Sequence, residues 1–453
     1  MIKDIVNNQR LFYLKGATLD LNFRRNAILK LKKSIDDNKE LIFEAFKMDF
    51  NKSKFDVITT ELSMIYAEID YVLKHMNKFF KPHKVRTNLI NFPAKSYLYH
   101  EPYGVILIMS PWNYPLQLTL LPLVSAIACG NTVVVKPSQY ASNVASIIKR
   151  ILDVFSDEYI ATVLGGREEN TLLLDQKFDY IFFTGGDVVG RFVMEKASKN
   201  LTPVCLELGG KSPCIVANDA DLDLAAKRIT WGKYLNGGQT CVAPDYLLVD
   251  EKVKDKLVKK IIEKIKEYYY QDNILTNDFP YIINQKHLER LLGIIDQSKI
   301  IFGGKNDGLL LEPTILDNVT FQDKVMQEEI FGPILPIITF NDINQVIEEL
   351  KIKDKPLALY IFTNNNEIKN NVLSKLSFGG GCVNDVIMHL TNHHLPFGGV
   401  GRSGMGSYHG EKSFMTFSHE KSIFIKSRKE INLKYPPYNN KKIKIIKKIL
   451  KVK

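Results

Sequence analysis

Three continuous apolar runs, each ending in a polar turn, limit how this chain can fold. The runs span residues 104–110, 132–138 and 180–186, and helical stretches such as residues 142–155 lie between them. Apolar runs without alternation are typical of strands buried on both faces of a parallel sheet. Strand, helix, strand units cross over with a right hand and build a doubly wound sheet. Ligands of such sheets bind beyond the carboxyl ends of the strands, and Asn113, Lys136 and Gly185 fall just beyond the expected strand ends.

A second alternating region follows residue 241. The sequence predicts a helix over 252–269 and strands over 335–340 and 358–362. The inward face of that helix is expected to carry Val253, Leu257, Ile261, Ile265 and Tyr268. Apolar residues at helical spacing predict helices over the first eighty residues, and residues 94–102 are expected to be extended. We therefore expect two α/β units and a smaller extended part.

Composition places the chain among globular proteins. It has 453 residues, of which 45% are hydrophobic and 25% charged, enough for two or three domains with large cores. The five cysteines are Cys129, Cys205, Cys214, Cys241 and Cys382. They lack the paired spacing of zinc or disulfide sites, so we expect no metal and a reducing, cytoplasmic location. We find no secretory leader and no uncharged stretch long enough to span a membrane.

Much of the net charge of +11 comes from the end of the chain. Seven lysines lie in the last thirteen residues, and without them basic residues exceed acidic ones by only four. The charge is therefore a property of the tail, and we expect no nucleic-acid partner.

Three polar segments contain the residues needed for acyl chemistry. Residues 235–244, LNGGQTCVAP, place Cys241 after a glycine-rich approach that lets a ligand come close to the backbone. Residues 206–213, LELGGKSP, contribute Glu207, and residues 111–115, PWNYP, contribute Asn113. A thiol, a carboxylate and an amide donor suit nucleophilic attack on a carbonyl. Taken alone, each has a plainer interpretation: a packed cysteine, a surface or capping glutamate, and a turn asparagine.

In their order along the chain, these segments resemble the aldehyde dehydrogenase superfamily. The matching pieces are PWNYP at 111–115, KPS at 136–138, FTGG at 183–186, LELGGKSP at 206–213, GQTC at 238–241, EEIFGP at 328–333 and LPFGG at 395–399. The similarity runs from the first helices to about residue 426. The stretches 384–389, 404–410 and 434–437 resemble the class 3 branch, which includes fatty aldehyde dehydrogenases.

The resemblance implies an α/β fold with three parts. A doubly wound cofactor-binding domain would comprise residues 1–83 and 102–208, and a related α/β catalytic domain residues 209–420. Residues 84–101 and 421–453 would form a small bridging and oligomerisation part with the basic tail.

The resemblance also implies the roles of the reacting residues. Cys241 would attack the aldehyde carbon to form a thiohemiacetal and later a thioester. The Asn113 amide and the Cys241 backbone N–H would stabilise the oxyanion. Glu207 would be the general base for the hydrolytic water, with a pKa raised by its apolar neighbours.

The cofactor implied by the resemblance is NAD or NADP. Lys136 would reach the adenosine ribose and Glu329 the nicotinamide ribose, with Phe331 packing nearby. Gly185 and Gly190 would let the backbone and a helix approach the cofactor.

One position leaves the choice between the two cofactors open. The family usually has a glutamate after KPS, and here the residue is Gln139. A carboxylate there would bind the ribose 2′-hydroxyl and repel a 2′-phosphate, whereas an amide removes that repulsion.

We expect oxidation of medium- to long-chain aliphatic or aromatic aldehydes to carboxylic acids by a homodimer. One alternative is a CoA-acylating aldehyde dehydrogenase, although those relatives generally lack the deacylating glutamate that Glu207 supplies. The other alternative is a catalytically silent binding relative, against which the complete set of Asn113, Glu207 and Cys241 argues.

The lysine-rich tail has two interpretations. Ile445, Ile446, Ile449 and Leu450 form an apolar stripe on a helix whose other face is lysine. The tail could be a solvated or subunit-packing end. It could also make peripheral contact with an anionic membrane, which the hydrophobic C-terminal anchors of fatty aldehyde relatives favour.

Overall fold

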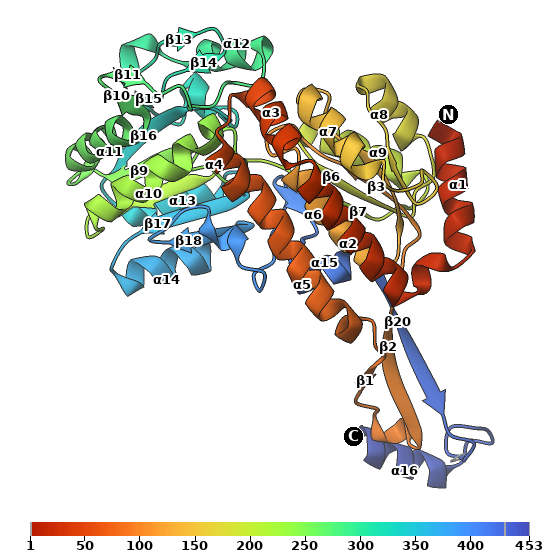
Figure 1. Ribbon diagram of the computed structural model, residues 1–453. Coiled ribbons are helices and arrows are strands. Elements are labelled where there is room, and N and C mark those ends of the chain that lie inside the picture. The colour runs from red at the N-terminus through yellow and green to blue at the C-terminus, as the bar shows by residue number, and fades with distance from the viewer. Residues whose placement is uncertain (1, 430–431, 453) are drawn as a thin grey trace.

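The computed structural model describes residues 2–429 and 432–452. Lys453 of the tail, and residues 1, 430 and 431 of the predicted domain ranges, lie outside the described residues. Figure 1 shows two α/β lobes side by side, with an arm that projects from one of them and carries the C-terminal end. The predicted fold class is confirmed, because each lobe is built on its own largely parallel sheet.

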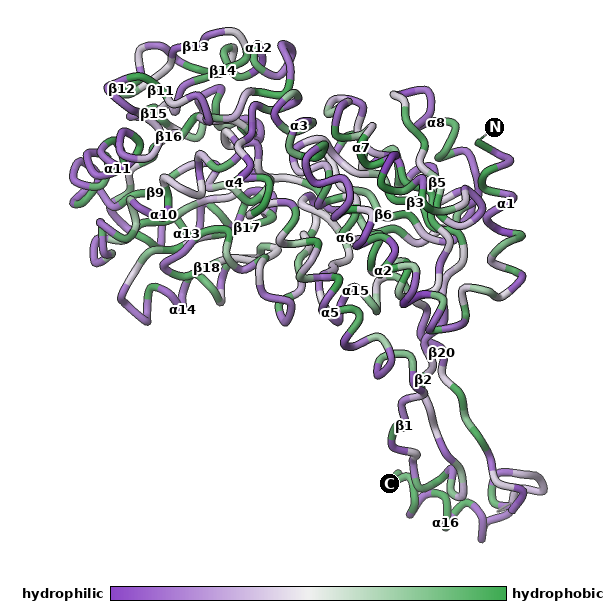
Figure 2. The backbone as a smooth tube through the Cα atoms, in the orientation of Figure 1, coloured by the Kyte–Doolittle hydropathy of each residue, from purple (hydrophilic) through white to green (hydrophobic). Residues whose placement is uncertain are grey.

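The first lobe contains a six-stranded sheet in the order β19-β7-β6-β3-β4-β5. Its strands are β3 (Val105–Met109), β4 (Thr132–Lys136), β5 (Ile160–Thr162), β6 (Tyr180–Thr184), β7 (Val204–Glu207) and β19 (Gly404–Met405). The three apolar runs of the sequence are β3, β4 and β6, and β3 pairs in parallel with both of the others. Every residue of β3 and β4 is buried. Figure 2 shows these strands in a hydrophobic part of the chain, as expected for a sheet covered on both faces.

Helices cover both faces of this sheet. They are α1 (Ile2–Leu14), α2 (Leu21–Asp37), α3 (Lys39–Phe50), α4 (Lys54–Val57), α5 (Ser63–Phe79), α6 (Gln117–Ala128), α7 (Ser142–Leu152), α8 (Arg167–Leu174) and α9 (Asp187–Ser198). The predicted N-terminal helices are confirmed. Helix α6 is buried along its whole length, because α2 and α5 pack over it.

The second lobe contains a seven-stranded sheet in the order β12-β15-β16-β9-β8-β17-β18. Its strands are β8 (Pro213–Val216), β9 (Tyr246–Asp250), β12 (Ile300–Phe302), β15 (Thr314–Leu316), β16 (Ile334–Phe340), β17 (Ala358–Phe362) and β18 (Gly380–Val383). Its helices are α10 (Leu222–Tyr234), α11 (Lys254–Tyr269), α12 (Gln285–Ile294), α13 (Ile343–Lys351) and α14 (Asn366–Lys375). Two hairpins, β10 (Tyr270–Gln271) with β11 (Ile274–Leu275) and β13 (Asn306–Asp307) with β14 (Leu310–Leu311), lie outside the sheet.

Most of the inward face predicted for residues 252–269 is correct. Leu257, Ile261 and Ile265 are buried in α11. Val253 precedes the helix and Tyr268 lies near its end, and both are only partly buried.

The arm is a three-stranded antiparallel sheet with a terminal helix. It consists of β1 (His83–Val85), β2 (Ala94–Pro102), β20 (Ser418–Lys426) and α16 (Asn440–Leu450). The nine-residue ladder of β2 and β20 runs from the Ala94–Lys426 pair to the Pro102–Ser418 pair. Leu89, Phe92 and Phe424 are exposed on this arm. Among the described residues, no helix is long and apolar enough to cross a membrane.

One segment lies in another lobe than the predicted domain ranges gave it. Residues 404–416 fall in the range expected for the second lobe, yet β19 pairs with β7 of the first sheet and α15 (Glu411–Thr416) packs on α6. The chain must cross the first lobe to reach β20. A two-residue edge strand is too short to produce a periodic sequence signal.

Candidate functional site

A cavity of about 800 Å³ lies between the two lobes, at the carboxyl ends of β6 and β7. Loops after β3, β6 and β7 line one side, and loops of the second lobe line the other. The cavity brings together Asn113, Glu207 and Cys241, which are far apart in the sequence. Glu329 and Phe331 line the same cavity. Of the three residues expected beyond strand ends, Asn113 and Gly185 line this cavity and Lys136 does not.

A left-handed backbone segment presents Cys241 to the cavity. Asn236, Gly237 and Gly238 have φ values of 56°, 62° and 73°, between the end of α10 and the thiol. A Cβ at position 238 would lie 2.3 Å from the carbonyl oxygen of Gly332. Glycine is therefore required both by the conformation and by the close contact, and Cys241 remains partly exposed.

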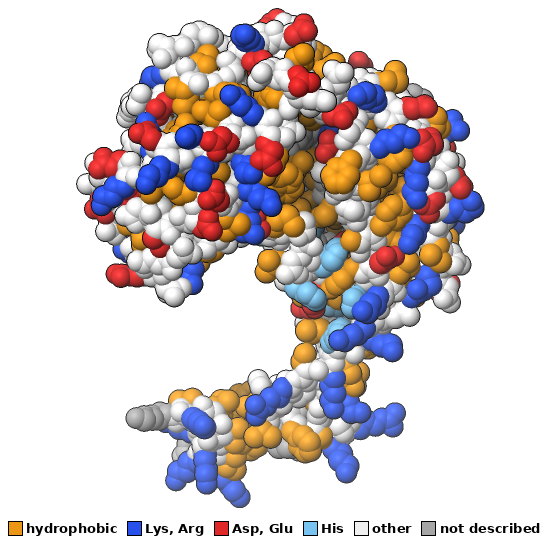
Figure 3. All heavy atoms as spheres, turned by 60° about the vertical axis from the view of Figure 1, so that its left-hand side comes forward, with side chains coloured by type: hydrophobic (Ala, Val, Ile, Leu, Met, Phe, Trp, Pro, Cys, Tyr) orange, Lys and Arg blue, Asp and Glu red, His pale blue; other side chains and the backbone are white. Residues whose placement is uncertain are grey.

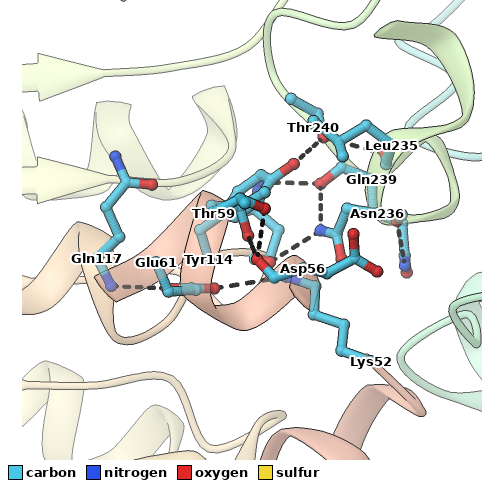
Figure 4. A network of polar contacts seen from close by, with 12 residues as sticks. Lys52, Asp56, Thr59, Glu61, Tyr114, Gln117, Leu235, Asn236, Gln239 and Thr240 are labelled. Carbon is cyan, nitrogen blue, oxygen red and sulfur yellow. Dashed lines mark hydrogen bonds and ion pairs between the residues drawn. The ribbon is translucent and has the colours of Figure 1, made fainter. Parts of the chain in front are cut away.

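Hydrogen bonds from the loop after β3 hold this segment. Asn113 Nδ2 donates to the Gln239 carbonyl oxygen at 3.0 Å, and Asn236 Nδ2 donates to the Asn113 carbonyl oxygen at 2.9 Å. The hydroxyl groups of Tyr114 and Thr240 lie 2.6 Å apart, and Figure 4 shows these two residues beside Asn236 and Gln239. The amide donor and the nucleophile are thus held in one rigid unit.

A buried ion pair lies beneath the ring of Tyr114, and sequence reasoning missed it. Lys52 Nζ lies 3.4 Å from Glu61 Oε1 and 4.5 Å from the centre of the Tyr114 ring. Glu61 Oε2 accepts a hydrogen bond from the Gln117 backbone N–H at 2.7 Å. Burial raises the pKa of Glu61 to about 7 despite the nearby ammonium group. In sequence, a lysine and a glutamate nine residues apart resemble ordinary surface charges.

The cavity shifts the protonation of its two reactive groups. Burial raises the pKa of the Cys241 thiol to about 12, and the carboxylates of Glu329 and Glu207 add to the shift. Burial also raises the pKa of Glu207 well above its ordinary value. The Cys241 thiol is therefore protonated at neutral pH in the ligand-free site, and its proton must be removed before attack.

The first glycine of LELGGKSP, Gly209, is explained by Glu329. A Cβ at position 209 would lie 2.0 Å from Glu329 Oε2, and a hydrogen bond from the Gly210 backbone favours the charged carboxylate. Burial and the charge of Asp245 nevertheless raise the pKa of Glu329 to about 8. The side chain thus lies directly over the glycine backbone at the cavity wall.

Lys211 of the same motif fixes the loop that carries Glu329, a role the sequence did not suggest. Its Nζ donates to Asp245 Oδ2 at 2.5 Å and to the carbonyl oxygens of Val325 and Glu328 at 3.0 and 2.8 Å. Asp245 Oδ1 in turn accepts from the Ile330 backbone N–H at 2.9 Å.

Phe331 completes an aromatic wall, with a φ of 51° that turns its ring towards the cavity loops. Its ring centre lies 5.3 Å from that of Trp112, in an edge-to-face arrangement.

The start of α9 fits a phosphate-containing cofactor. A Cβ at Gly186 would meet nothing within 4 Å, so the backbone at this helix N-terminus is open to a ligand. At Gly185 a Cβ would lie 2.6 Å from the Phe183 ring. At Gly190 it would lie 2.7 Å from Leu208, so this glycine lets α9 pack closely against the end of β7.

Lys136 and Gln139 lie at the neighbouring strand end and do not line the main cavity. Lys136 Nζ donates to the Gly165 carbonyl oxygen at 2.7 Å, and burial lowers its pKa to about 8. The Gln139 side chain lies against Gly166. Sequence reasoning missed Glu169, whose Oε2 accepts from the Gly166 N–H at 2.6 Å and whose charge acts on Lys136. The available signal was a glutamate three residues after Gly166, the spacing at which a first-turn carboxylate accepts from the N-cap N–H.

Among the residues that the structure describes, no three His, Cys, Asp or Glu side chains gather in a metal-binding arrangement.

Comparison with known proteins matches residues 8–423 to the model of the aldehyde dehydrogenase family. A curated relative, the 4,4′-diaponeurosporen-aldehyde dehydrogenase of Staphylococcus aureus, is 45% identical over 98% of this chain and 98% of its own. The dimeric NADP-preferring aldehyde dehydrogenase of Mus musculus is 42% identical over 96% of this chain and 98% of its own. Members of aldehyde dehydrogenase family 3 are similar at 42–44% identity.

The solved structures agree with these matches. The substrate-bound state of Staphylococcus aureus AldH superposes with a TM-score of 0.97 at 44% identity and covers 99% of both chains.

Proposed function

This chain belongs to the aldehyde dehydrogenase family, and from that membership we propose which of its residues oxidise the aldehyde and which aldehydes it takes. The family and class 3 branch predicted from the sequence are confirmed. The protein is an enzyme that oxidises aldehydes to carboxylic acids with NAD or NADP. The observation that carries the assignment of residues is the convergence of Cys241, Glu207 and Asn113 on one cavity.

Cys241 is the nucleophile. Once the Cys241 thiol has given its proton to a water molecule of the cavity, Sγ bonds to the aldehyde carbon, and the carbonyl oxygen becomes the oxyanion of a thiohemiacetal. Asn113 has two amide hydrogens, and the bond to Gln239 uses one of them. The other is available to the oxyanion, together with the Cys241 backbone N–H.

Glu207 is the general base of hydrolysis. A bound nicotinamide cofactor supplies the acceptor for the hydride that leaves the substrate carbon. The substrate then remains on Cys241 as a thioester. Glu207 takes a proton from water, the hydroxide bonds to the acyl carbon, and the carbon–sulfur bond breaks to release the acid. The buried surroundings of Glu207 suit this role, because a base with a raised pKa binds the proton more strongly.

The cofactor is held at the carboxyl ends of the first sheet. The backbone at Gly185 and the open backbone at Gly186 receive the phosphates. Glu329 binds the nicotinamide ribose and Lys136 the adenosine ribose, with Phe331 packing nearby. Gln139 lacks the charge that would repel a 2′-phosphate, which supports use of NADP. The mouse relative is named NADP-preferring.

The substrates are medium- to long-chain aliphatic or aromatic aldehydes. Trp112, Leu118 and Phe331 give the cavity an apolar wall next to Cys241. The Staphylococcus aureus relative is named for 4,4′-diaponeurosporen-aldehyde.

The enzyme forms a homodimer through the arm. Leu89 is 84% exposed and Phe92 63% exposed, which favours burial against a second copy. The mouse relative is named dimeric. The tail helix makes peripheral contact with an anionic membrane, since Ile445, Ile449 and Leu450 are exposed on a helix rich in lysine.

Product analysis with and without CoA tests this proposal against its rivals. Incubation of the full-length protein with a long aldehyde and either cofactor should give the free acid at the same rate whether or not CoA is present. An acyl-CoA product that replaces the acid would support the CoA-acylating alternative. Cofactor binding without turnover on any aldehyde would support a silent relative.

A further inference from the structure

A buried cysteine contacts the carboxylate that we assign as the general base. Cys205 Sγ lies 3.5 Å from Glu207 Oε1 and donates to it. The two residues are two apart in β7, so their side chains leave the same face of the strand. Glu207 Oε2 is buried and has no hydrogen-bond partner among the described residues, while Glu207 itself lines the cavity with Cys241. One carboxylate oxygen is therefore held by the strand, and the other is left for water.

The edge strand β19 and the residue after it pack over the Cys205 thiol and hold it in position. Cys205 is fully buried. Gly406, with a φ of +87°, covers it so closely that a Cβ there would lie 2.7 Å from Sγ. The pairing of Gly404 with Glu207 sets this contact. Burial raises the pKa of Cys205 well above its ordinary value, so the group remains an S–H donor at neutral pH.

Among the described residues, three other ionisable groups lie close enough to Glu207 to be affected by its charge. They are Tyr180 of β6, Tyr408 before α15, and Cys241 of the nucleophile loop. Burial raises the pKa of each, so all three are neutral near pH 7. The Cys205 hydrogen bond is thus the interaction that favours the charged form of Glu207.

We propose that Cys205 is a positioning residue, which orients the Glu207 carboxylate and favours its charged form for hydrolysis of the thioester. This inference rests on the proposed role of Glu207. The thiol is a weak donor. Substitution of Cys205 can therefore shift the equilibrium between the charged and the protonated form of Glu207 in either direction. Alanine removes the donor, and serine supplies a stronger one of nearly the same size.

The test compares Cys205→Ala and Cys205→Ser in the full-length protein. The readouts are the initial burst of reduced cofactor and the steady-state rate as functions of pH. Hydrolysis needs the carboxylate, so turnover rises with pH through the pKa of Glu207 in the thioester. Loss of the donor should move this rise to higher pH in the alanine variant, and serine should move it to lower pH. A shift of roughly half to one pH unit is expected for one hydrogen bond.

Cys214→Ser and Cys214→Ala are matched controls, because Cys214 is an equally buried thiol in β8 of the other sheet. Opposite shifts in the two Cys205 variants, with none in the controls, support the proposal. An unshifted pH profile, or a rate lowered equally at every pH, would overturn it and leave Cys205 a packing residue. If the alanine variant does not fold, the shift of the serine variant decides alone. Failure of Glu207→Gln to slow hydrolysis would instead overturn the role of Glu207 itself.

Discussion

The phenol oxygen of Tyr114 lies 2.6 Å from the Thr240 hydroxyl, although 126 residues separate them in the sequence. Thr240 directly precedes the nucleophile, and Tyr114 directly follows the oxyanion donor Asn113. The bond therefore ties both halves of the acylation site together. Beneath the ring, the Lys52 ammonium group lies 4.5 Å from its centre, which limits how far the ring can move.

Tyr114→Phe should lower kcat more than it affects cofactor binding. The substitution keeps the ring over Lys52 and removes one buried hydrogen bond, which costs about 1 kcal/mol of stability. Displacement of Cys241 relative to Asn113 by a fraction of an ångström should cost roughly tenfold in rate. Thermal unfolding and steady-state kinetics check this. Thr240→Ser, which keeps a hydroxyl, is the matched control, and an unchanged kcat in Tyr114→Phe would show that the bond does not position the nucleophile.

Cys241→Ser should abolish oxidation and leave cofactor affinity nearly unchanged. An alcohol is a far weaker nucleophile than a thiol near neutral pH, so turnover should fall roughly a thousandfold or more. A fluorescence titration with the cofactor measures its affinity for the variant. Cys382→Ser is the control, since Cys382 is also partly exposed but does not line the cavity. Substantial turnover by the Cys241 variant would contradict its assignment as nucleophile.

Glu207→Gln should slow deacylation much more than acylation. Rapid mixing should show a burst of reduced cofactor close to one per active site, followed by slow turnover. Loss of the burst together with turnover would assign Glu207 an earlier role.

The same substitution should also stabilise the protein at alkaline pH. Burial raises the pKa of Glu207 in the folded state. The folded chain therefore holds this proton more tightly than the unfolded chain, and the stabilisation is lost as pH rises between the two pKa values. Glutamine cannot ionise. Thermal unfolding at several pH values should show an advantage of the variant that grows with pH, and a constant difference would contradict this linkage.

The sheets and most of the candidate site could be predicted from the sequence because their signals are local. The apolar run at 104–110 is β3, and the glycines before Cys241 give a left-handed segment that few other residues adopt. The residues at strand ends then meet, because parallel strands end at one edge.

What could not be predicted depends on contacts across the fold. Lys52 and Glu61 are charged residues of the helical region, and only the packing of α6 shows that they are buried together. Cys205 and Glu207 are two residues apart in the sequence, but Gly406, which packs over the Cys205 thiol, lies 201 positions after Cys205. Neither arrangement has a sequence period that could reveal it.

Cofactor preference should respond to two carboxylate positions. Gln139→Glu should shift the ratio of kcat/KM values towards NAD, because a second carboxylate beside Lys136 repels a 2′-phosphate. Glu169→Gln should shift it towards NADP, since Glu169 acts on the same lysine. Each charge change should alter the ratio several-fold, with the larger effect at low salt. If neither variant changes the ratio, the residues at positions 139 and 169 do not select the cofactor.

The tail helix should bind anionic membranes without being needed for the chemistry. Figure 1 shows α16 at the far end of the arm, away from both lobes, and Figure 3 shows basic and hydrophobic side chains together on that arm. Each lysine near an anionic surface contributes about 1 kcal/mol, and the exposed Ile445, Ile449 and Leu450 add apolar burial at about 25 cal/mol per Å². Together these contributions suit reversible attachment.

Removal of residues 440–453 should therefore spare activity on short soluble aldehydes and lower activity on long aldehydes presented in vesicles. Co-sedimentation with anionic vesicles at low and high salt measures attachment directly, and high salt should mimic the deletion in the intact chain. Neutral vesicles are the control for the electrostatic part, and Ile445→Asp with Ile449→Asp is the control for the apolar part. Equal sedimentation of the intact and shortened chains would exclude the anchor. A shortened chain that sediments equally and becomes monomeric in analytical ultracentrifugation would instead identify α16 as part of the dimer contact, because the same exposed isoleucines can be buried by a second copy of the chain.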